Sequence, residues 1–329
     1  METISVSTSI ITRKSPDEAG QAQRLQTENN ELHEEINRLR AQLNAAEQIA
    51  YHDALTGLPN RHGYDRYVAA LQTLCHTVEF RASLDNGRGG MGGGLLVVQV
   101  DIDHFKSINT MLTHFGGDTV LKEFAGRLAR SSRMNATPAK DAAGRCLGSL
   151  MVEEYMIRSG MTGMDLVSRW GGEEFFCLFP LCYRDAEAAW TAYDDADKIV
   201  QRLMNSIRRD PVMLTVNEPT YETIKHQIIG NPAHYYRDAK LVSNGSKHVA
   251  LPVSASMGYA VIGWEEFNAH PNDDTAHLFR NVVDLMRRAK ETGRNRAVTV
   301  RASMHDKNAA IHVFEGRALN KTQMSDMVH

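Results

Sequence analysis

The 329-residue chain has 37 Lys and Arg residues against 40 Asp and Glu residues, so its formal net charge is −3. This balance gives no support to a nucleic-acid-binding protein, and a hydrophobic content of 42% supplies ample material for a buried core. No stretch approaches the roughly 18 apolar residues that span a bilayer, and the first residues lack a basic segment followed by an apolar one. We therefore expect a cytoplasmic protein that binds neither nucleic acid nor membrane. The four cysteines lack the paired spacing of a metal site, so we expect them to be reduced.

The N-terminal 50 residues show two compositions. Residues 1–21 are polar and rich in Ser and Thr, and we expect them to be unstructured. Residues 22–50 then follow a heptad pattern. The d positions are Leu25, Leu32, Leu39 and Ala46, and the a positions are Asn29, Ile36, Leu43 and Ala50. This pattern predicts a parallel coiled coil that joins two copies of the chain, with an amphipathic helix folded onto its own domain as the alternative.

A helix is expected from about Gly63 to Cys75, and a glycine-rich connector follows it at 85–94. The connector lacks Gly-Lys-Ser/Thr and leads into a strand, which argues against a phosphate-binding loop of the P-loop type. The strand, Leu95 to Val100, is an unbroken apolar run that ends in Asp101-Ile102-Asp103. Further helices are expected around 105–111 and 118–131.

Two adjacent glycines lie between the apolar segments of residues 165–180. Gly171 and Gly172 can adopt the positive φ angles of a two-residue hairpin, which would fix the turn just before Glu173 and Glu174. If this hairpin neighbours the strand that ends at Asp101, Asp101 and Glu173 would meet over one divalent cation site.

A last helix, expected from about Phe279 to Thr292, carries two basic residues of interest one turn apart. Lys290 and Arg294 are four residues apart, so on one helix face they could present two positive charges to a triphosphate. The alternative is an ordinary solvated surface, which is what a pair of basic residues usually forms.

These segments together resemble the GGDEF family, the diguanylate cyclases. Arg169-Trp-Gly-Gly-Glu-Glu-Phe175 resembles the family signature in its variant with Glu at the third position, and four other motifs occur in the family's order across residues 51–300. They are Asp53-Ala-Leu-Thr-Gly-Leu-Pro-Asn-Arg61, Asp101-x-Asp-x-Phe-Lys-x-x-Asn109 with Gly117-Asp118, Val253-Ser-Ala-Ser-Met-Gly258, and Lys290-x-x-x-Arg294-Asn295. The resemblance implies an α/β (α+β) domain like the nucleotide cyclases and the polymerase palm, with a mainly antiparallel sheet flanked by helices.

The resemblance also implies roles for individual residues. Asp101, the Ile102 carbonyl and Glu173 would hold Mg²⁺ or Mn²⁺, two ions in each site, with Glu173 as the base and Glu174 as its catalytic neighbour. The substrate GTP would be contacted by the residues that match the family's guanine and phosphate positions. These residues are Phe105, Asn109, His114 and Asp118 at the base, and Lys290 and Arg294 at the phosphates.

Three positions depart from the family pattern. Thr110 stands where the family usually has Asp, and Thr113 replaces a glycine, so the loop that leads to Asp118 could have altered geometry. The product-inhibition motif Arg-x-x-Asp reads Thr162-Gly-Met-Asp165. Without the arginine we expect that inhibitory site to be degenerate.

Residues 51–301 are thus expected to form the catalytic domain, with insertions near 135–160 and 208–247 and a C-terminal tail at 302–329. We expect the first insertion to be a tolerated surface loop with a short helix at 150–157, and the second to be a structured excursion of open purpose. The expected function is synthesis of cyclic di-GMP from two GTP by a homodimer, with a regulatory protein as a further potential partner. The alternatives are a catalytically silent GTP- or cyclic di-GMP-binding module and an enzyme that makes a mixed GMP–AMP product, against which Asp118 argues.

Overall fold

The computed structural model describes residues 16–85, 92–132, 152, 155–156, 164–183, 192–230, 239–244, 246–269, 275–303 and 306–315. By its internal contacts the chain divides into two units, Met1–Ala50 and Tyr51–His329.

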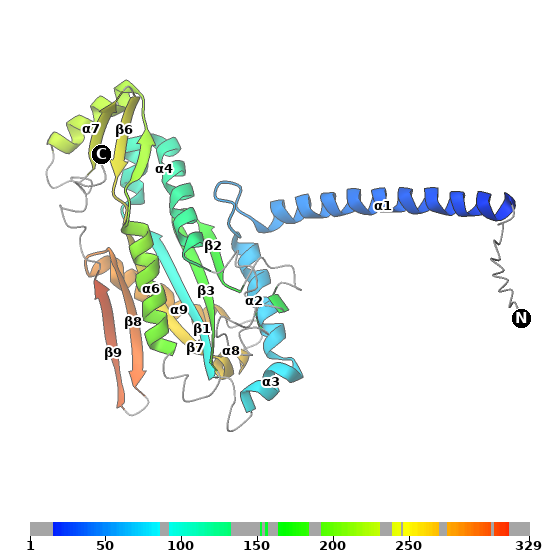
Figure 1. The fold of residues 1–329 in the computed structure, drawn as a ribbon. Coiled ribbons are helices and arrows are strands. Elements are labelled where there is room, and N and C mark those ends of the chain that lie inside the picture. Colours follow the sequence, from blue (N-terminus) through cyan, green and yellow to red (C-terminus); the bar gives the residue numbers. More distant parts are fainter. Residues whose placement is uncertain are drawn as a thin grey trace, which may run out of the picture. The chain divides into compact units, whose positions relative to one another are not determined.

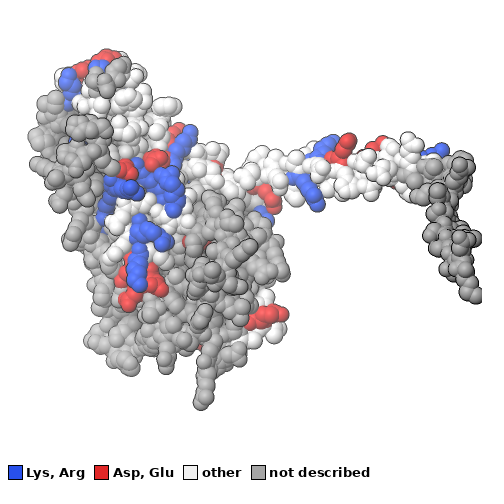
Figure 2. Space-filling model, in the orientation of Figure 1, with Lys and Arg blue, Asp and Glu red and all other residues white. Residues whose placement is uncertain are grey.

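The N-terminal unit is formed by helix α1 (Pro16–Tyr51). The helix begins at Pro16, so residues 16–21 are helical where the sequence predicted no structure, and proline is well tolerated in the first helical turn. The apolar side chains of the predicted heptads are exposed, from 44% at Ile36 to 59% at Leu25 and Leu43. Figure 2 shows basic and acidic side chains interspersed along α1. Of the helices that the structure describes, none combines the length and the hydropathy needed to cross a membrane.

The second unit is built on a six-stranded sheet with the order β2-β3-β1-β7-β8-β9 (Figure 1). Neighbouring strands are antiparallel except β7 and β8, which confirms the predicted mainly antiparallel sheet. The strands are β1 (Gly92–Ile102), β2 (Leu166–Gly171), β3 (Glu174–Tyr183), β7 (Ala255–Gly263), β8 (Arg296–Ser303) and β9 (Asp306–Glu315). Strand β9 lies in the predicted tail, so the sheet extends beyond the predicted domain end at residue 301 to Glu315.

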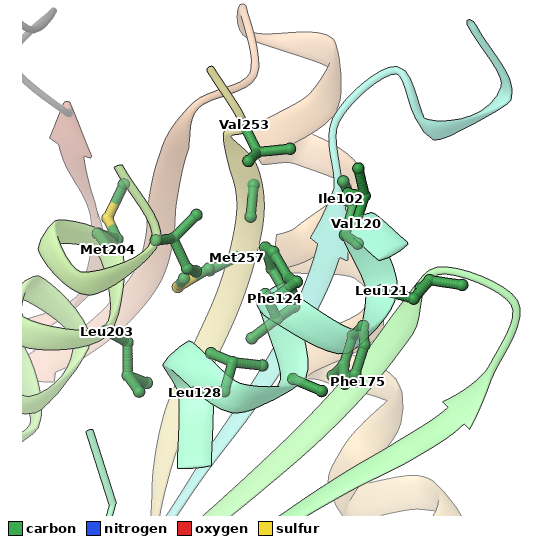
Figure 3. Close-up of a cluster of buried hydrophobic side chains, with 14 of the residues drawn as sticks. Ile102, Val120, Leu121, Phe124, Leu128, Phe175, Leu203, Met204, Val253 and Met257 are labelled. Carbon is green, nitrogen blue, oxygen red and sulfur yellow. The ribbon is translucent and has the colours of Figure 1, made fainter. Parts of the chain in front are cut away.

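Helices cover both faces of this sheet. They are α2 (Arg61–Cys75), α3 (Val78–Asp85), α4 (Phe105–Arg130), α6 (Ala192–Arg208), α8 (Trp264–Ala269) and α9 (Thr275–Glu291). Side chains of α4 and α6 form one hydrophobic cluster with the sheet, which Figure 3 shows around Phe124, Phe175 and Met257. Side chains of α2, α3 and α8 form the second cluster.

Strand β1 is the centre of the unit because both of its faces are apolar. Leu96 and Val98 belong to the first cluster, whereas Leu95 and Val97 belong to the second. A strand buried on both faces has a continuous apolar sequence instead of an alternating one, as the sequence predicted here. The end of β1 is therefore held rigidly between its neighbours β3 and β7.

Helix α9 packs on β7 so closely that only glycine fits between them. A Cβ atom on Gly258 would lie 2.3 Å from both the Met286 nitrogen and the Val282 oxygen. Real Cβ contacts are never this short, so the absence of a side chain at Gly258 sets the distance between helix and sheet. Lys290 lies near the end of α9, so this contact also sets the distance between Lys290 and the sheet.

The second predicted insertion forms β4 (Val212–Thr215), α7 (Glu218–Gly230), β5 (Lys240–Asn244) and β6 (Ser246–Leu251). The strands make an antiparallel sheet with the order β4-β6-β5. Leu214, Ile224 and Val249 are buried in the same cluster as α4, so the insertion is part of the core. The buried Arg127 guanidinium donates to the Ile207 and Asp210 carbonyls at 2.6 Å. These hydrogen bonds stabilise the connection between α6 and β4.

Most of the first predicted insertion lies outside the described residues. Val152, Tyr155 and Met156 are helical, and Val152 and Met156 are fully buried in the second cluster. For these two residues the expectation of a surface loop was wrong, because their apolar side chains complete the core beneath α2.

Candidate active site

The β2–β3 hairpin places Glu173 in the turn itself. Gly171 pairs with Glu174, so the two central residues of the turn are Gly172 and Glu173. Gly172 has a φ of 54°, whereas Gly171 has no positive φ. The prediction that both glycines form the turn was therefore wrong by one residue, although glycine at the first central position is a standard hairpin choice. As a result Glu173 lies at the tip and Glu174 begins β3.

The end of β1 lies directly beside this hairpin. The register pairs Asp101 with Glu174, and the Ile102 nitrogen donates to the Glu173 carbonyl oxygen at 3.3 Å. The Asp101 side chain is nearly buried, and the Lys290 ammonium lies 2.7 Å from its Oδ2 atom. The structure thus brings together, at one end of the sheet, three carboxylates and a lysine that are up to 189 residues apart in the sequence.

The surroundings of Asp101 change the pKa of its carboxyl group. Burial raises the pKa of Asp101 to about 6, the Lys290 ammonium opposes that rise, and the carboxylates of Glu173 and Glu174 add to it. A buried carboxylate beside two others is stabilised by positive charge. Asp101 therefore sits in a place that favours a cation, and the Lys290 ammonium provides one.

The donors at this end of the sheet fit a hard divalent cation. Two carboxylates, Asp101 and Glu173, and the Ile102 carbonyl supply oxygen atoms, which Mg²⁺ prefers, and Mg²⁺ usually keeps several waters and substrate oxygens as further ligands. Among the described residues, no three or more His, Cys, Asp or Glu side chains form a metal-binding group by themselves.

Helix α4 carries the predicted base-contacting residues on two sides of a kink. Thr113, with φ 65° and ψ 175°, interrupts the helix and separates the predicted 105–111 and 118–131 segments. A Cβ atom on Gly117 would lie 1.8 Å from Asn109 Oδ1 and 3.3 Å from Phe105. The kink therefore brings Phe105 and Asn109 against the residue that precedes Asp118.

The exposure of these residues differs. Phe105 is buried at 6%, whereas His114 and Asp118 are exposed. Asn109 lies between these extremes. Phe105 and Asn109 thus lie on the same helix as two exposed polar side chains.

Thr113 adopts a backbone conformation that is essentially restricted to glycine. We expect Thr113→Gly to raise the free energy of unfolding by about 1–2 kcal/mol, because glycine removes the strain caused by the threonine side chain at positive φ. Chemical denaturation of both proteins measures this difference. A lower free energy of unfolding for Thr113→Gly would show that the threonine contacts outweigh the strain.

Lys290 and Arg294 do not lie one turn apart on a helix, contrary to the prediction. Helix α9 ends at Glu291, and Gly293 follows with a φ of 125°. Arg294 lies in the turn beyond it, with its nitrogen donating to the Ala289 carbonyl at 2.9 Å. Arg294 is exposed and acts on His104, whose pKa is lowered first by burial and then by the Arg294 charge.

An ion pair that the sequence did not predict ties the hairpin to the 53–61 motif. The Arg169 Nη1 atom donates to both carboxylate oxygens of Asp53 at 3.0 Å, and its Nε and Nη2 atoms donate to the Gly172 carbonyl. The Arg169 backbone nitrogen also donates to the Pro59 carbonyl at 2.9 Å. Arg169 therefore holds the turn that contains Glu173 against the start of the second unit.

We expect Asp53→Asn to lower the free energy of unfolding by about 1–3 kcal/mol at neutral pH, because it leaves the Arg169 guanidinium with a weaker acceptor. Burial raises the pKa of Asp53, but hydrogen bonds from Thr56 and Arg169 outweigh it and lower the pKa overall. A lowered pKa stabilises the fold above the unfolded pKa of about 3.9, and the contribution is lost as the pH falls through the folded pKa. Urea denaturation at pH 7 and pH 3 should show a smaller difference between Asp53→Asn and the wild type at pH 3; an equal difference at both values would contradict this account.

The predicted inhibitory site comprises Thr162 and Asp165. Asp165 is buried at 2% exposure, and Thr162 lies outside the described residues. We therefore expect weak or no cyclic di-GMP binding at this position, since an arginine fork for phosphate is missing. A calorimetric titration with cyclic di-GMP tests this, and tight binding that Asp165→Ala abolishes would contradict it.

Comparison with known families gives this geometry a context. Residues 50–152, which include β1, its acidic end and the whole of α4, match the family described as "Diguanylate cyclase, GGDEF domain". Residues 50–152 are thus similar to the GGDEF domain family. The sequence resemblance is therefore confirmed at the level of the domain family.

The individual relatives are distant. The chain is 27% identical over 248 residues to the uncharacterised protein YhcK of Bacillus subtilis, covering 75% of this chain and 45% of YhcK. It is 29% identical over 193 residues to the diguanylate cyclase DgcP of Pseudomonas aeruginosa, covering 59% of this chain and 21% of DgcP. The chain thus spans less than half the length of these relatives. Among solved structures, the coiled coil and GGDEF domain of DgcB from Caulobacter crescentus in complex with c-di-GMP matches with a TM-score of 0.44 and 18% identity, covering 84% of this chain and 98% of that one.

Proposed function

We propose that this protein is a diguanylate cyclase, which condenses two GTP molecules into cyclic di-GMP and releases two pyrophosphates. The observation that carries the proposal is the meeting of Asp101, Glu173 and Lys290 at one end of the sheet, with Asp101 held 2.7 Å from Lys290. The same domain carries Asn109 and Asp118 on α4. Carboxylates for a metal, basic residues for phosphates and an amide–carboxylate pair for a base are the groups that nucleotide cyclisation needs.

The acidic end of the sheet would hold the reacting phosphate. Asp101, the Ile102 carbonyl and Glu173 would bind Mg²⁺ or Mn²⁺, two ions per site, and a bound ion supplies positive charge to the triphosphate. Glu173 would accept the proton of the 3′-hydroxyl. The hydroxyl oxygen then forms a bond to the α-phosphorus of the other GTP, while the bond from that phosphorus to the pyrophosphate oxygen breaks. Glu174, which pairs with Asp101 in the ladder, would add negative charge beside Asp101.

Lys290 and Arg294 would neutralise the phosphates as the pyrophosphate leaves. Lys290 Nζ already lies beside Asp101, so a small rotation of its flexible stem can shift its charge from the carboxylate to a phosphate. Arg294 is presented by a turn beyond α9, and its planar fork suits a bidentate contact with phosphate oxygens.

The base would be selected on α4. The Asp118 carboxylate can accept from the two donor groups on one edge of guanine, N1–H and N2–H, whereas adenine offers that edge fewer donors. Asn109 and His114 would add polar contacts, and Phe105 would supply an apolar wall. This supports GTP over ATP as the substrate.

A homodimer through α1 would place two such domains in one molecule. Leu25, Leu32, Leu39 and Leu43 are each more than half exposed, and an apolar seam with this spacing is buried by a second copy of the same helix. Each 3′-hydroxyl could then attack the GTP of the other protomer. A regulatory protein could act on this arrangement.

The test is to incubate the purified chain with GTP and Mg²⁺, with and without ATP, and to identify the products by mass spectrometry. We expect cyclic di-GMP from the wild type and no product from Asp101→Asn, which keeps the size of the side chain but removes its charge. A mixed GMP–AMP product would replace the substrate assignment, and identical product from Asp101→Asn would remove the proposed metal site.

A second candidate function is a silent GTP- or cyclic di-GMP-binding module. It is favoured by the Lys290–Asp101 ion pair, in which the lysine occupies the carboxylate that a metal would need, and by the strained Thr113. Binding of GTP without any product, at several protein concentrations, would favour this module over the enzyme.

A further inference from the structure

A second acidic residue, Asp103, lies two positions beyond Asp101 and is 4% exposed. The Ser256 hydroxyl donates to its Oδ1 atom at 2.6 Å, and the Ser254 hydroxyl donates to its Oδ2 atom at 2.7 Å. The Asp103 nitrogen donates to the Ser254 carbonyl at 3.0 Å. Asp103 is thus anchored to the start of β7, and its carboxylate is turned to the protein instead of to the metal ligands.

The Asp103 Oδ2 atom accepts a second hydrogen bond, which comes from the turn after α9. The Asn295 nitrogen donates to Asp103 Oδ2 at 2.9 Å, across 192 residues of sequence. Asn295 is also held from the other side by Arg208, the last residue of α6. Arg208 Nε donates to Asn295 Oδ1 at 2.6 Å and its Nη2 donates to the Asn295 carbonyl at 2.6 Å. Asn295 thus makes hydrogen bonds through its backbone nitrogen to Asp103, and through its carbonyl oxygen and its Oδ1 atom to Arg208.

The turn that contains Asn295 has an unfavourable backbone conformation. Gly293, Arg294 and Asn295 all have positive φ angles, of 125°, 60° and 50°. Residues other than glycine rarely adopt this region, and they persist there only where the surroundings determine the conformation. Arg294 lies between Gly293 and Asn295. The contacts of Asn295 therefore also fix the backbone of Arg294, from which the Arg294 side chain extends.

The guanidinium of Arg208 is suited to this role. It is partly buried, and burial lowers its pKa to about 10, an effect that the Asp103 charge opposes. Arg208 therefore stays protonated near neutral pH and keeps its donors for Asn295. Its planar fork is more rigid than a lysine amine, so it can hold a backbone carbonyl in one place.

We propose that Asp103, Asn295 and Arg208 form a clamp that fixes the Gly293–Asn295 turn and so positions Arg294 for the nucleotide phosphates. The members of the clamp are positioning residues, because they act through Arg294. The second half of this statement rests on the proposed function, in which Arg294 contacts GTP. The two aspartates of the Asp101-Ile102-Asp103 sequence thus have different roles. Asp101 faces the proposed cation, whereas Asp103 contacts the turn after α9.

The first test compares Arg208→Gln with Arg209→Gln in the full chain. Arg209 is the next residue, with 81% of its side chain exposed, so it is a matched control. We expect Arg208→Gln and Asp103→Asn to speed amide deuterium uptake in the peptide that covers residues 292–297, while Arg209→Gln leaves it unchanged. Unchanged uptake in both clamp variants would overturn the clamp, and thermal unfolding reports whether each variant is folded.

The second test measures binding of a GTP analogue with a methylene group between the α and β phosphates, which cannot be cleaved there. We expect Arg208→Gln to weaken binding about tenfold, the loss expected when one charge-assisted contact is misplaced. In an Arg294→Ala background the same change should have no further effect, since the clamp acts only through Arg294. Independent, additive losses in the double variant would overturn the positioning role.

The two tests separate failure of the clamp from failure of the proposed function. If the wild type binds no GTP analogue, the proposed function falls, and deuterium uptake alone then judges the clamp. If the analogue binds and Arg294→Ala weakens it, but Arg208→Gln does not, the proposed function stands and the positioning role is overturned.

Discussion

Replacing Glu173 with glutamine is expected to lower the rate of cyclic di-GMP formation by about 10²–10⁴-fold, the range for loss of a general base. Glu173 lies in the turn, where glutamine fits equally well, so the free energy of unfolding should change by less than about 0.5 kcal/mol. The loss then comes from chemistry, because an amide neither accepts the hydroxyl proton nor carries the charge that a cation needs. Initial rates with saturating GTP and Mg²⁺ measure it.

Glu174→Gln is the matched control for this experiment. Glu174 is the adjacent residue, has the same size and also acts on Asp101, but it begins β3 and pairs with Asp101 in the ladder. We expect about a tenfold loss, since Glu174 shapes the charge around Asp101 without touching the reacting hydroxyl. A larger loss for Glu174→Gln than for Glu173→Gln would exchange the roles of the two carboxylates.

Gly258→Ala is expected to lower the free energy of unfolding by about 3 kcal/mol or more, at the upper end of the range for overpacked cores. The new methyl group would meet backbone atoms of Val282 and Met286 at 2.3 Å, and backbone atoms cannot rotate away as a side chain can. The helix must therefore lift from the sheet or the variant does not fold. Urea denaturation measures the change.

Gly263→Ala, at the other end of β7, is the control for that substitution. A Cβ atom on Gly263 meets nothing within 4 Å, and Gly263 has no positive φ. We expect its free energy of unfolding to stay within about 1 kcal/mol of the wild type. Similar losses at Gly258 and Gly263 would mean that strand flexibility matters more than the distance between β7 and α9.

Features that depend on local sequence were predicted well. The apolar run of β1 gave the correct strand because a strand buried on both faces needs apolar residues throughout. The two glycines located the hairpin to within one residue, because few other residues tolerate a positive φ. The helices predicted around 105–111 and 118–131 correspond to the two parts of α4 on either side of Thr113.

Features that depend on distant parts of the chain were not predicted. Helical spacing put Arg294 beside Lys290, but Gly293 ends the helix pattern and the turn is fixed by Asp103 and Arg208. The Arg169–Asp53 and Lys290–Asp101 pairs join segments more than 100 residues apart. Strand β9 was assigned to a tail because its sequence has no matching motif, although it pairs along β8 from Arg296 to Ser303.

The hairpin turn also limits how the domain can change in length. Beyond Glu174, alternate residues of β3 enter opposite cores, with Phe175 and Phe179 in one and Phe176 and Leu178 in the other. One extra residue next to Glu173 would shift the pairing of β3 and send every side chain of the strand to the wrong side. The turn that carries Glu173 must therefore keep its length for the domain to keep two intact cores.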